Sequence, residues 1–324
     1  MKPALPSIAI ALLVGLVLGA GASSVYRRVQ CGDYRLINPD FACGERQAIR
    51  KEPYLVFTND LRAWIEKQRQ AGGVSSIAVY FRDLRFGPLF GIDENEGFVP
   101  ASLLKLPIVL TFMDAAGDLP DLLSTPVRYS RDGVTHFDMP RQIEASATGL
   151  SDGQTCTIED LLRNTIVHSD NLSYYLLLEH MNHVIPGGGA RIARTFQELG
   201  IVDPRTFADE VVTVRGYASL LRMLYNVSYL DIEGSEKVLS WLASSTFTTG
   251  IGAGVPEGVV VANKFGEREL GADIRQLHDC GIVYFPDNPY LLCVMTRGSD
   301  WKRLHEAIAG VSRLVWQEVT SRRR

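Results

Sequence analysis

Two stretches of the chain place a serine three residues before a lysine. Ser102 and Lys105 lie in FVPASLLKLP, and Ser299 and Lys302 form a second match. On a helix, positions i and i+3 share a face, so the hydroxyl and the amine can meet. A desolvated lysine can accept the serine proton and turn the serine into a nucleophile. Either match alone is a weak signal, because serine is also a common helix cap.

The surroundings of the two serines favour Ser102. It follows a predicted pair of strands and opens an apolar helix, whose first backbone N–H groups can stabilise an oxyanion. Ser299 follows the last predicted strand and has no reactive residue downstream. Pro107 falls within the first turns of the helix that begins at Ser102, which predicts a local kink.

Two further short motifs carry residues that could assist a serine nucleophile. The sequence SDN at 169–171 lies between two helical segments, although all three residue types also cap helices. The sequence KFG at 264–266 ends a strongly apolar stretch, VVVANKFG, and alone it is typical of a strand end and turn. Gly266 also removes a side chain where a substrate backbone might lie along the strand.

The hydrophobic periodicity predicts helices and strands that bring these motifs together. A helix and a strand pair come first, then a block of helices, then three strands and a last helix. The predicted elements are helices at 52–70, 102–116, 158–167, 172–181, 190–199, 214–224, 235–243 and 301–319, and strands at 77–81, 88–92, 259–261, 281–285 and 290–295. This order predicts an α/β (α+β) fold, with an antiparallel sheet covered by the terminal helices and an all-helical lobe inserted at about 101–245. A site between the sheet and the lobe is expected.

The order S-x-x-K, S-D-N, K-x-G is far more specific than any of its parts. With it, the sequence resembles class A β-lactamases and the related penicillin-binding D-Ala-D-Ala peptidases. The resemblance covers about residues 53–320. It includes IAVYFRDLRFGPLFGIDENEGFVPASLLKLP, TIEDLLRNTIVHSDNLSYYLL, and VVVANKFGE followed by GIVYF. It implies a β-lactamase-like catalytic domain over 53–320.

The resemblance implies roles for the catalytic residues. Ser102 would be the nucleophile that opens a β-lactam or peptide carbonyl, and Lys105 would be the base that activates it. Ser169, helped by Lys264, would relay a proton to the departing nitrogen. Crowding the two lysine ammonium groups would lower the pKa of at least one, as a base requires.

It also implies residues that bind the substrate. Asn171 would hold the substrate amide and the Lys105 side chain, with Gly266 beside the substrate. The backbone N–H groups of Ser102 and Glu267 would form the oxyanion hole. No cofactor and no metal is implied, and we expect a monomer.

The sequence departs from the family pattern in three ways. Phe265 replaces a Thr or Ser whose hydroxyl would bind a substrate carboxylate. Cys280 stands just before Gly281, where many class A enzymes carry an arginine. Arg268 or Arg275, in the connection 267–279, could replace that arginine, and a position on the surface is the alternative for both.

The third departure concerns deacylation. Class A enzymes carry a glutamate in an Ω-loop with the pattern E-x-x-L-N, which activates the deacylating water. Here residues 201–212 contain Asp203, Asp209 and Glu210 but no such pattern. Three functions therefore stay open: a β-lactamase with an unusual deacylation base, a D-Ala-D-Ala carboxypeptidase or transpeptidase, and a non-catalytic β-lactam or peptidoglycan sensor.

The N-terminal segment predicts delivery outside the cytoplasm. Residues 3–26 carry no charge, and residues 7–26 can form an apolar helix long enough to anchor the chain in a membrane. The alternative is a signal peptide cleaved near Ala22. Residues 27–52 are typical of a linker, in which Cys31 and Cys43 are expected to form a disulfide, with two free thiols as the alternative.

The remaining cysteines and the histidines give weaker signals. Cys280 and Cys293 flank a turn and could face each other on paired strands or simply fill a sheet, and Cys156 is the odd cysteine. Zinc is disfavoured because the chain has no CxxC pair. His180 and His183 end a predicted helix, where histidines favour the helix dipole, so a metal site there is disfavoured.

Charge and motifs exclude other classes of function. The 33 basic and 37 acidic side chains give a formal net charge of −4. Such a chain has no electrostatic footprint for nucleic acid. The absence of a G-x-S-x-G motif argues against an α/β-hydrolase.

Overall fold

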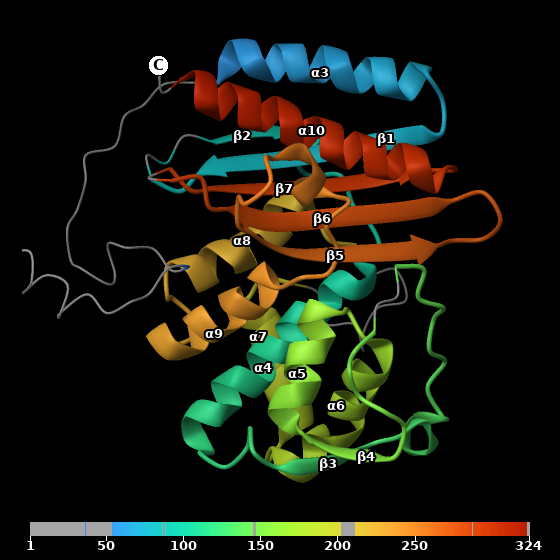
Figure 1. Ribbon diagram of the computed structural model, residues 1–324, viewed down its shortest axis with the longest axis vertical. Coiled ribbons are helices and arrows are strands. Elements are labelled where there is room, and N and C mark those ends of the chain that lie inside the picture. The colour runs from blue at the N-terminus through green and yellow to red at the C-terminus, as the bar shows by residue number, and fades with distance from the viewer. Residues whose placement is uncertain are drawn as a thin grey trace, which may run out of the picture.

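A five-stranded antiparallel sheet forms the centre of the fold in the computed structural model (Figure 1). The strand order is β2-β1-β7-β6-β5, so β5 lies at one edge. The strands are β1 (Val74–Asp83), β2 (Leu89–Ile92), β5 (Val261–Glu269), β6 (Arg275–Val283) and β7 (Tyr290–Gly298). The structure describes residues 36, 54–85, 87, 89–144, 147–201, 211–286 and 288–322. The predicted anchor at 7–26 and the predicted Cys31–Cys43 pair lie outside these residues.

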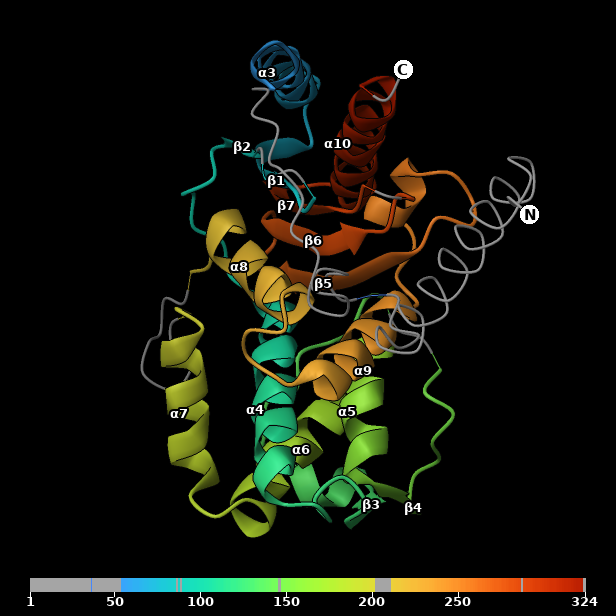
Figure 2. The ribbon, with the colours of Figure 1, turned by 90° about the vertical axis from the view of Figure 1, so that its left-hand side faces the viewer.

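Two terminal helices cover one face of the sheet, as predicted. Helix α3 (Leu55–Gln70) lies beside α10 (Trp301–Ser321), far away in sequence (Figures 1 and 2). Both helices present apolar side chains at helical spacing, such as Leu61 and Ile65 on α3 and Leu304 on α10. These side chains form a buried core with the strand residues of the same sheet face.

The opposite face of the sheet packs on the inserted lobe, which has a second core (Figure 2). Most of the lobe is helical, as the periodicity predicts. Its helices are α4 (Lys105–Asp118), α5 (Ile158–Val167), α6 (Asn171–Val184), α7 (Gly188–Glu198), α8 (Val214–Tyr225) and α9 (Ile232–Ala243), and the 3₁₀ turns are η1 (Ala101–Leu104) and η2 (Arg131–Val134), with η3 (Ile251–Gly254) beyond the lobe. The two cores fix the sheet between two helical layers.

The lobe is not all-helical, which corrects the prediction. Strands β3 (Pro126–Tyr129) and β4 (Gln154–Thr157) form a separate antiparallel pair, with Val127 opposite Cys156. Each strand has only four residues. A period-two pattern over four residues is too short to stand out among the helical segments around it.

A kink at Pro107 stays a prediction, but it does not interrupt the helix that contains this residue. Residues 101–104 form the 3₁₀ turn η1, and α4 then runs without interruption from Lys105 to Asp118. Pro107 therefore lies in the first turn of α4, where the missing backbone N–H breaks no intrahelical hydrogen bond.

Strands β5 and β6 are longer than predicted. The K-x-G motif lies in the middle of β5, which runs on to Glu269, and β6 begins at Arg275. The connection between the strands is therefore 270–274 and not 267–279. The charged residues at 267–269, 273 and 275 make the strand ends look like a loop in the sequence, because one side of this hairpin end is exposed to solvent.

Cys280 and Cys293 face each other across β6 and β7 and form a disulfide. This outcome is the first of the two alternatives left open by the sequence. Cys156 is a free, buried cysteine. Burial raises the pKa of its thiol to about 11, so it is an unreactive packing residue.

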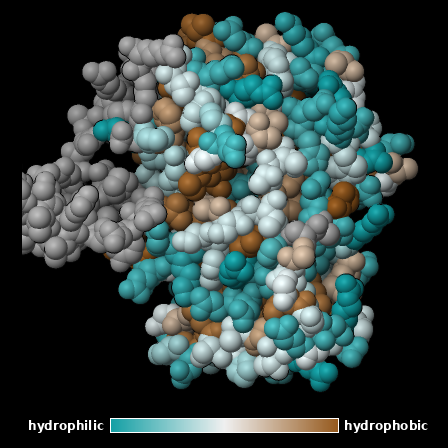
Figure 3. Space-filling model, viewed as in Figure 1, coloured by the Kyte–Doolittle hydropathy of each residue, from teal (hydrophilic) through white to brown (hydrophobic). Residues whose placement is uncertain are grey.

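On the face in Figure 3, hydrophilic side chains dominate and the hydrophobic ones form small separate patches. Within the described ranges, no helix combines the length and the apolar character that crossing a bilayer requires.

Candidate active site

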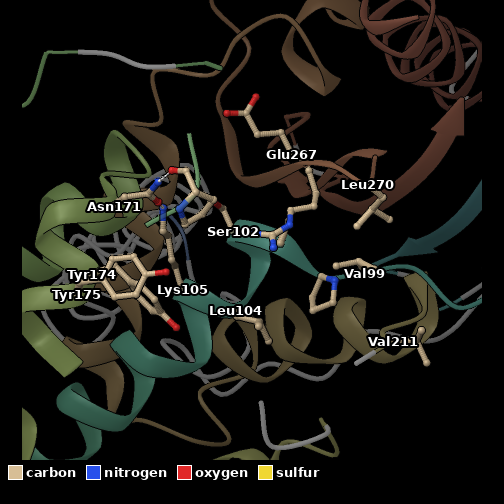
Figure 4. Close-up of a pocket in the computed structure, with 14 residues that line it drawn as sticks. Val99, Ser102, Leu104, Lys105, Asn171, Tyr174, Tyr175, Val211, Glu267 and Leu270 are labelled. Carbon is tan, nitrogen blue, oxygen red and sulfur yellow. Dashed lines mark hydrogen bonds between the residues drawn. The ribbon is translucent and has the colours of Figure 1, made fainter. Parts of the chain in front are cut away.

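A pocket of about 640 Å³ opens between the edge strand β5 and the helical lobe. It is lined by five residues that the sequence singled out: Ser102, Lys105, Asn171, Glu267 and Arg268. Figure 4 shows Ser102 between Asn171 and Lys105 on one side and Val99 and Leu270 on the other. The fold thus brings together residues separated by more than 160 positions in sequence.

Ser102 lies in a tight turn at the start of the helical lobe. Ala101 has a left-handed backbone with φ 50°, and Ser102 follows it in η1. β5 packs directly beneath this turn at Gly266, where a Cβ atom would lie 2.8 Å from the carbonyl oxygen of Pro100. The missing side chain of Gly266 thus makes room for the turn that carries Ser102, and the predicted contact of Gly266 with substrate stays a prediction.

Lys105 is buried one turn after Ser102, with its amine directed at the SDN turn. Lys105 Nζ donates to Asn171 Oδ1 at 2.7 Å, to Ser169 Oγ at 3.2 Å, and to the carbonyl oxygen of Ser169. Burial lowers the pKa of Lys105 to about 7, against the opposing effect of Asp170 and Glu267. A large share of the amine is therefore neutral at pH 7 and able to accept a proton.

Lys264 approaches the same serine from the sheet. Its Nζ donates to Ser169 Oγ and to the Phe265 carbonyl oxygen, each at 2.8 Å. Burial, and then the charge of Lys105, hold the pKa of Lys264 well below its usual value. Burial is thus the larger cause of the lowered pKa of Lys264, and crowding by the second lysine is the smaller cause. Ser169 Oγ connects the two amines, so a proton can pass among them.

The SDN turn places each of its residues differently. Ser169 has a left-handed backbone with φ 51°, which turns its buried hydroxyl toward the lysines. Asp170 is the N-cap of α6 and accepts a hydrogen bond from the backbone N–H of Ser173 at 2.7 Å. Asn171 donates through Nδ2 to Pro140 O at 2.9 Å. The helix-cap interpretation therefore holds for Asp170, while Ser169 and Asn171 face the lysines.

The structure places the candidates for a carboxylate-binding residue. Arg268 lines the pocket, whereas Arg275 donates to the carbonyl oxygen of Ser299 and lies 3.6 Å from Glu269. The Phe265 ring stacks on Phe247 at 4.3 Å in the core beneath α10. Of the two arginines, Arg268 is thus the one that lines the pocket, and its side chain is exposed to solvent.

Several pocket residues were missed by sequence reasoning. Tyr174 and Tyr175 line the pocket one turn after Asn171, a spacing from which they could have been found. Val211 and Leu270 also line it, but no motif marks them.

The Glu267 carboxylate accepts hydrogen bonds from the backbone N–H groups of Ile143 and Glu144, the closest at 2.7 Å, which ties β5 to the loop before β4. Burial raises the pKa of Glu267.

The second Ser-x-x-Lys match lies away from the pocket. Asp300 caps α10 by accepting from the Arg303 backbone N–H at 3.2 Å, and Lys302 is exposed to solvent.

His180 and His183 lie near each other with ring centroids 6.4 Å apart. Within the part of the chain that the structure describes, no cluster of three potential ligands could hold a metal. Asp203, Asp209 and Glu210 lie outside the described residues.

Comparison with solved structures shows the same fold. A PBP-A mutant, described as an acyl-enzyme complex with penicillin G, matches with a TM-score of 0.67 and 21% identity over 83% of this chain and 98% of that chain. A class A β-lactamase from Mycobacterium abscessus matches with a TM-score of 0.67 and 22% identity, over 80% and 99% of the two chains. A β-lactamase from Burkholderia phymatum matches with a TM-score of 0.66 and 21% identity, over 81% and 98%.

A search of curated proteins found no match to this chain. The model of the Beta-lactamase enzyme family matches residues 57–319, nearly all of the predicted catalytic domain. Together with the fold and the pocket, this match shows that the chain belongs to the β-lactamase enzyme family.

Proposed function

We propose that the protein is a β-lactamase-like serine hydrolase that opens β-lactam rings through an acyl-enzyme on Ser102 and hydrolyses this acyl-enzyme slowly. The observation that carries the proposal is the hydrogen-bonded series Lys105–Ser169–Lys264 beside Ser102 in one pocket. Two buried amines of lowered pKa, joined by a hydroxyl, can take a proton from one atom and return it to another. Few structural roles require that arrangement.

In the proposed acylation step, these groups act one after another. Ser102 Oγ attacks the carbonyl carbon of the substrate while its proton passes to neutral Lys105. The backbone N–H groups of Ser102 and Glu267 stabilise the oxyanion. As the tetrahedral intermediate collapses, the C–N bond breaks, and Ser169 gives its proton to the leaving nitrogen. Lys105 or Lys264 then restores the proton of Ser169, and the carbonyl carbon stays bound to Ser102 Oγ as an ester.

The Ser102 hydroxyl has no hydrogen-bond partner among the described residues, and Lys105 instead bonds to Ser169 and Asn171. Catalytic hydrogen bonds often tighten only when substrate is bound, so this geometry is compatible with Lys105 as the base. Rotation of the Lys105 side chain within the pocket would bring its amine to the serine.

A penicillin-binding D-Ala-D-Ala peptidase is the second candidate, and a sensor that stays acylated is the third. Both share the acylation step. The similarity to PBP-A, whose mutant structure is described as an acyl-enzyme complex with penicillin G, supports formation of an acyl-enzyme. It does not distinguish hydrolysis of that acyl-enzyme from its persistence.

Turnover of a chromogenic cephalosporin by the catalytic domain tests the proposal. Many turnovers per molecule select the β-lactamase. A burst of one equivalent without turnover selects the other two candidates, and release of D-Ala from a model peptide then identifies the peptidase. No covalent adduct with any β-lactam would contradict all three.

The acylation rate should depend on pH in the way that the Lys105 amine titrates. With a pKa of about 7, the neutral fraction of its amine rises roughly ten-fold between pH 6 and pH 8. We expect the acylation rate constant for a fluorescent penicillin to rise by about that factor and to level off above pH 8. Stopped-flow measurements from pH 5.5 to 9 check this. A rate that is flat or falling between pH 6 and 8 would exclude Lys105 as the base.

Arg268→Ala should weaken binding of substrates that carry a carboxylate. Removing the cation from the pocket removes a charge-assisted hydrogen bond, worth roughly 1.5–3 kcal/mol, or about 10- to 100-fold in acylation efficiency. Arg275→Ala is the matched control, because Arg275 contacts Ser299 and Glu269 instead. We expect the loss for benzylpenicillin and little loss for its methyl ester. Equal losses for both compounds would rule out a carboxylate contact.

We further propose that the chain works outside the cytoplasm. The buried Cys280–Cys293 disulfide supports this location, because structural disulfides persist in oxidising compartments. The anchor or signal peptide at residues 7–26 and the Cys31–Cys43 pair remain predictions from the sequence. Fractionation of the native cells, with non-reducing peptide mapping of both cysteine pairs, tests them together. Recovery in the cytoplasm with free thiols would contradict the proposed location.

A further inference from the structure

The backbone of Val99, three residues before Ser102, is held at both of its polar groups by side chains of one strand. The Val99 N–H donates to Gln276 Oε1 at 3.0 Å, and the Val99 carbonyl oxygen lies 3.0 Å from His278 Nε2. Gln276 and His278 are two positions apart on β6 and therefore point to the same face of the sheet. These two side chains replace the partners that a neighbouring strand would have given Val99.

Both residues are buried: Gln276 is 2% exposed and His278 is 0% exposed. His278 Nδ1 is also buried and has no hydrogen-bond partner among the described residues. The ring therefore carries its proton on Nε2 and donates it to Val99. The bond to Val99 thus satisfies the buried Nε2 atom of His278.

The β5–β6 register explains how His278 reaches Val99. His278 lies opposite Gly266, and Gly266 packs beneath Pro100. Because Gly266 has no side chain, the turn before Ser102 can lie on the sheet close to the His278 ring. A larger residue at 266 would push this turn away from β6.

The residues just before Val99 are fixed to the same sheet. Arg297 on β7 donates to the Gly97 carbonyl oxygen at 2.8 Å and pairs with Glu96 at 2.9 Å, and its guanidinium lies 4.8 Å from the Phe98 ring centroid. Phe98 and Val212 exchange two backbone hydrogen bonds. Val99 is thus the last fixed point before the chain turns at Ala101.

We propose that Gln276 and His278 are positioning residues, which hold Val99 and thereby set the place of Ser102 and its backbone N–H. Only Pro100 and Ala101 separate the held residue from the nucleophile, and Ala101 has φ 50°. A shift of Val99 therefore passes to Ser102 instead of being absorbed by flexible chain. The proposal rests on the proposed role of Ser102 as nucleophile.

The test compares variants that lose these bonds with variants that keep them. Gln276→Met and His278→Met keep side-chain length and remove the acceptor or the donor. His278→Gln keeps an N–H at a similar reach. Thr296→Val is the matched control, because Thr296 is equally buried and donates to Leu277 O at 2.6 Å, away from the Ser102 turn. Should His278→Met fail to fold, His278→Asn replaces it, with a polar group too short to reach Val99.

We expect each Met variant to lower the limiting acylation rate about 10- to 100-fold, with little change in the half-saturating concentration of fluorescent penicillin. His278→Gln should stay within about three-fold of the parent chain by the same reasoning. Thr296→Val should lower the melting temperature and leave the acylation rate unchanged. Met variants that lose stability like Thr296→Val but react at the parent rate would overturn the proposal.

A fluorophosphonate separates this proposal from the proposed function. The Ser102 oxygen displaces fluoride from phosphorus, a reaction that needs a placed serine but no β-lactam recognition. If the parent chain resists penicillin, the proposed function fails, and the rates of fluorophosphonate labelling across the same variants still decide the role of Gln276 and His278. Equal labelling rates in parent and Met variants would refute that role.

Discussion

Ser102→Ala is expected to remove covalent labelling by penicillin completely. Without the hydroxyl no ester can form, and the two buried lysines have no nucleophile to activate. Lys105→Met should leave the nucleophile but remove its base, which costs on the order of 10²–10⁴ in acylation rate. Fluorescent penicillin labelling, followed by mapping of the modified peptide, measures both variants.

Ser299→Ala is the matched control for this experiment. It removes the serine of the other Ser-x-x-Lys match, whose lysine is exposed in the first turn of α10. Labelling of this variant should equal that of the parent chain. An adduct on Ser299, or full labelling of Ser102→Ala, would show that the nucleophile has been assigned to the wrong residue.

The acyl-enzyme formed with benzylpenicillin should persist for minutes or longer. Deacylation needs a base that directs water at the ester, and such assistance is worth on the order of 10²–10⁴ in rate, or about 3–5 kcal/mol. Among the described residues, the pocket around Ser102 includes the apolar side chains of Val99, Leu104, Val211 and Leu270. The one described acidic residue that lines the pocket, Glu267, has its carboxylate bonded to Ile143 and Glu144.

Intact-protein mass spectrometry after mixing measures this lifetime. Asp209 and Glu210 are the acidic residues of the 201–212 segment nearest to helix α8 in sequence, and they suit the positive N-terminal end of that helix. Asp209→Asn and Glu210→Gln should therefore leave the lifetime unchanged. If the parent adduct clears within a second and either variant makes it persist, that residue is the deacylation base and the β-lactamase candidate is favoured.

The sequence was sufficient for the arrangement of the layers and for the central part of the site. The helices have strong 3.6-residue periodicity, and the three motifs each contain a residue type with a definite chemical use. Ser102, Lys105 and Asn171 indeed line one pocket. Their exact roles in the reaction stay predictions until the labelling experiments are done.

Other features depend on tertiary contacts that no local pattern records. β3 and β4 are too short to show a period, and the charged ends of β5 and β6 resemble a loop. The choice between Arg268 and Arg275 depends on where β5 ends, because the register of the hairpin decides which arginine faces the pocket. The contacts of Gln276 and His278 with Val99 could not be predicted for the same reason, because Val99 lies about 180 residues earlier in the sequence.

The left-handed backbone of Ala101 and Ser169 has a consequence for how this protein can evolve. A non-glycine residue in that conformation costs on the order of 1–3 kcal/mol, a sizeable share of a typical folding free energy of 5–15 kcal/mol. Glycine at position 101 would relieve the strain but would also loosen the turn before Ser102. Glycine at position 169 would in addition remove the Ser169 hydroxyl that joins the two lysines. Substitutions that raise the free energy of unfolding are therefore better tolerated at distant surface positions than at these two turns. The stability gained at the surface then determines how many destabilising substitutions near the pocket the fold can accept.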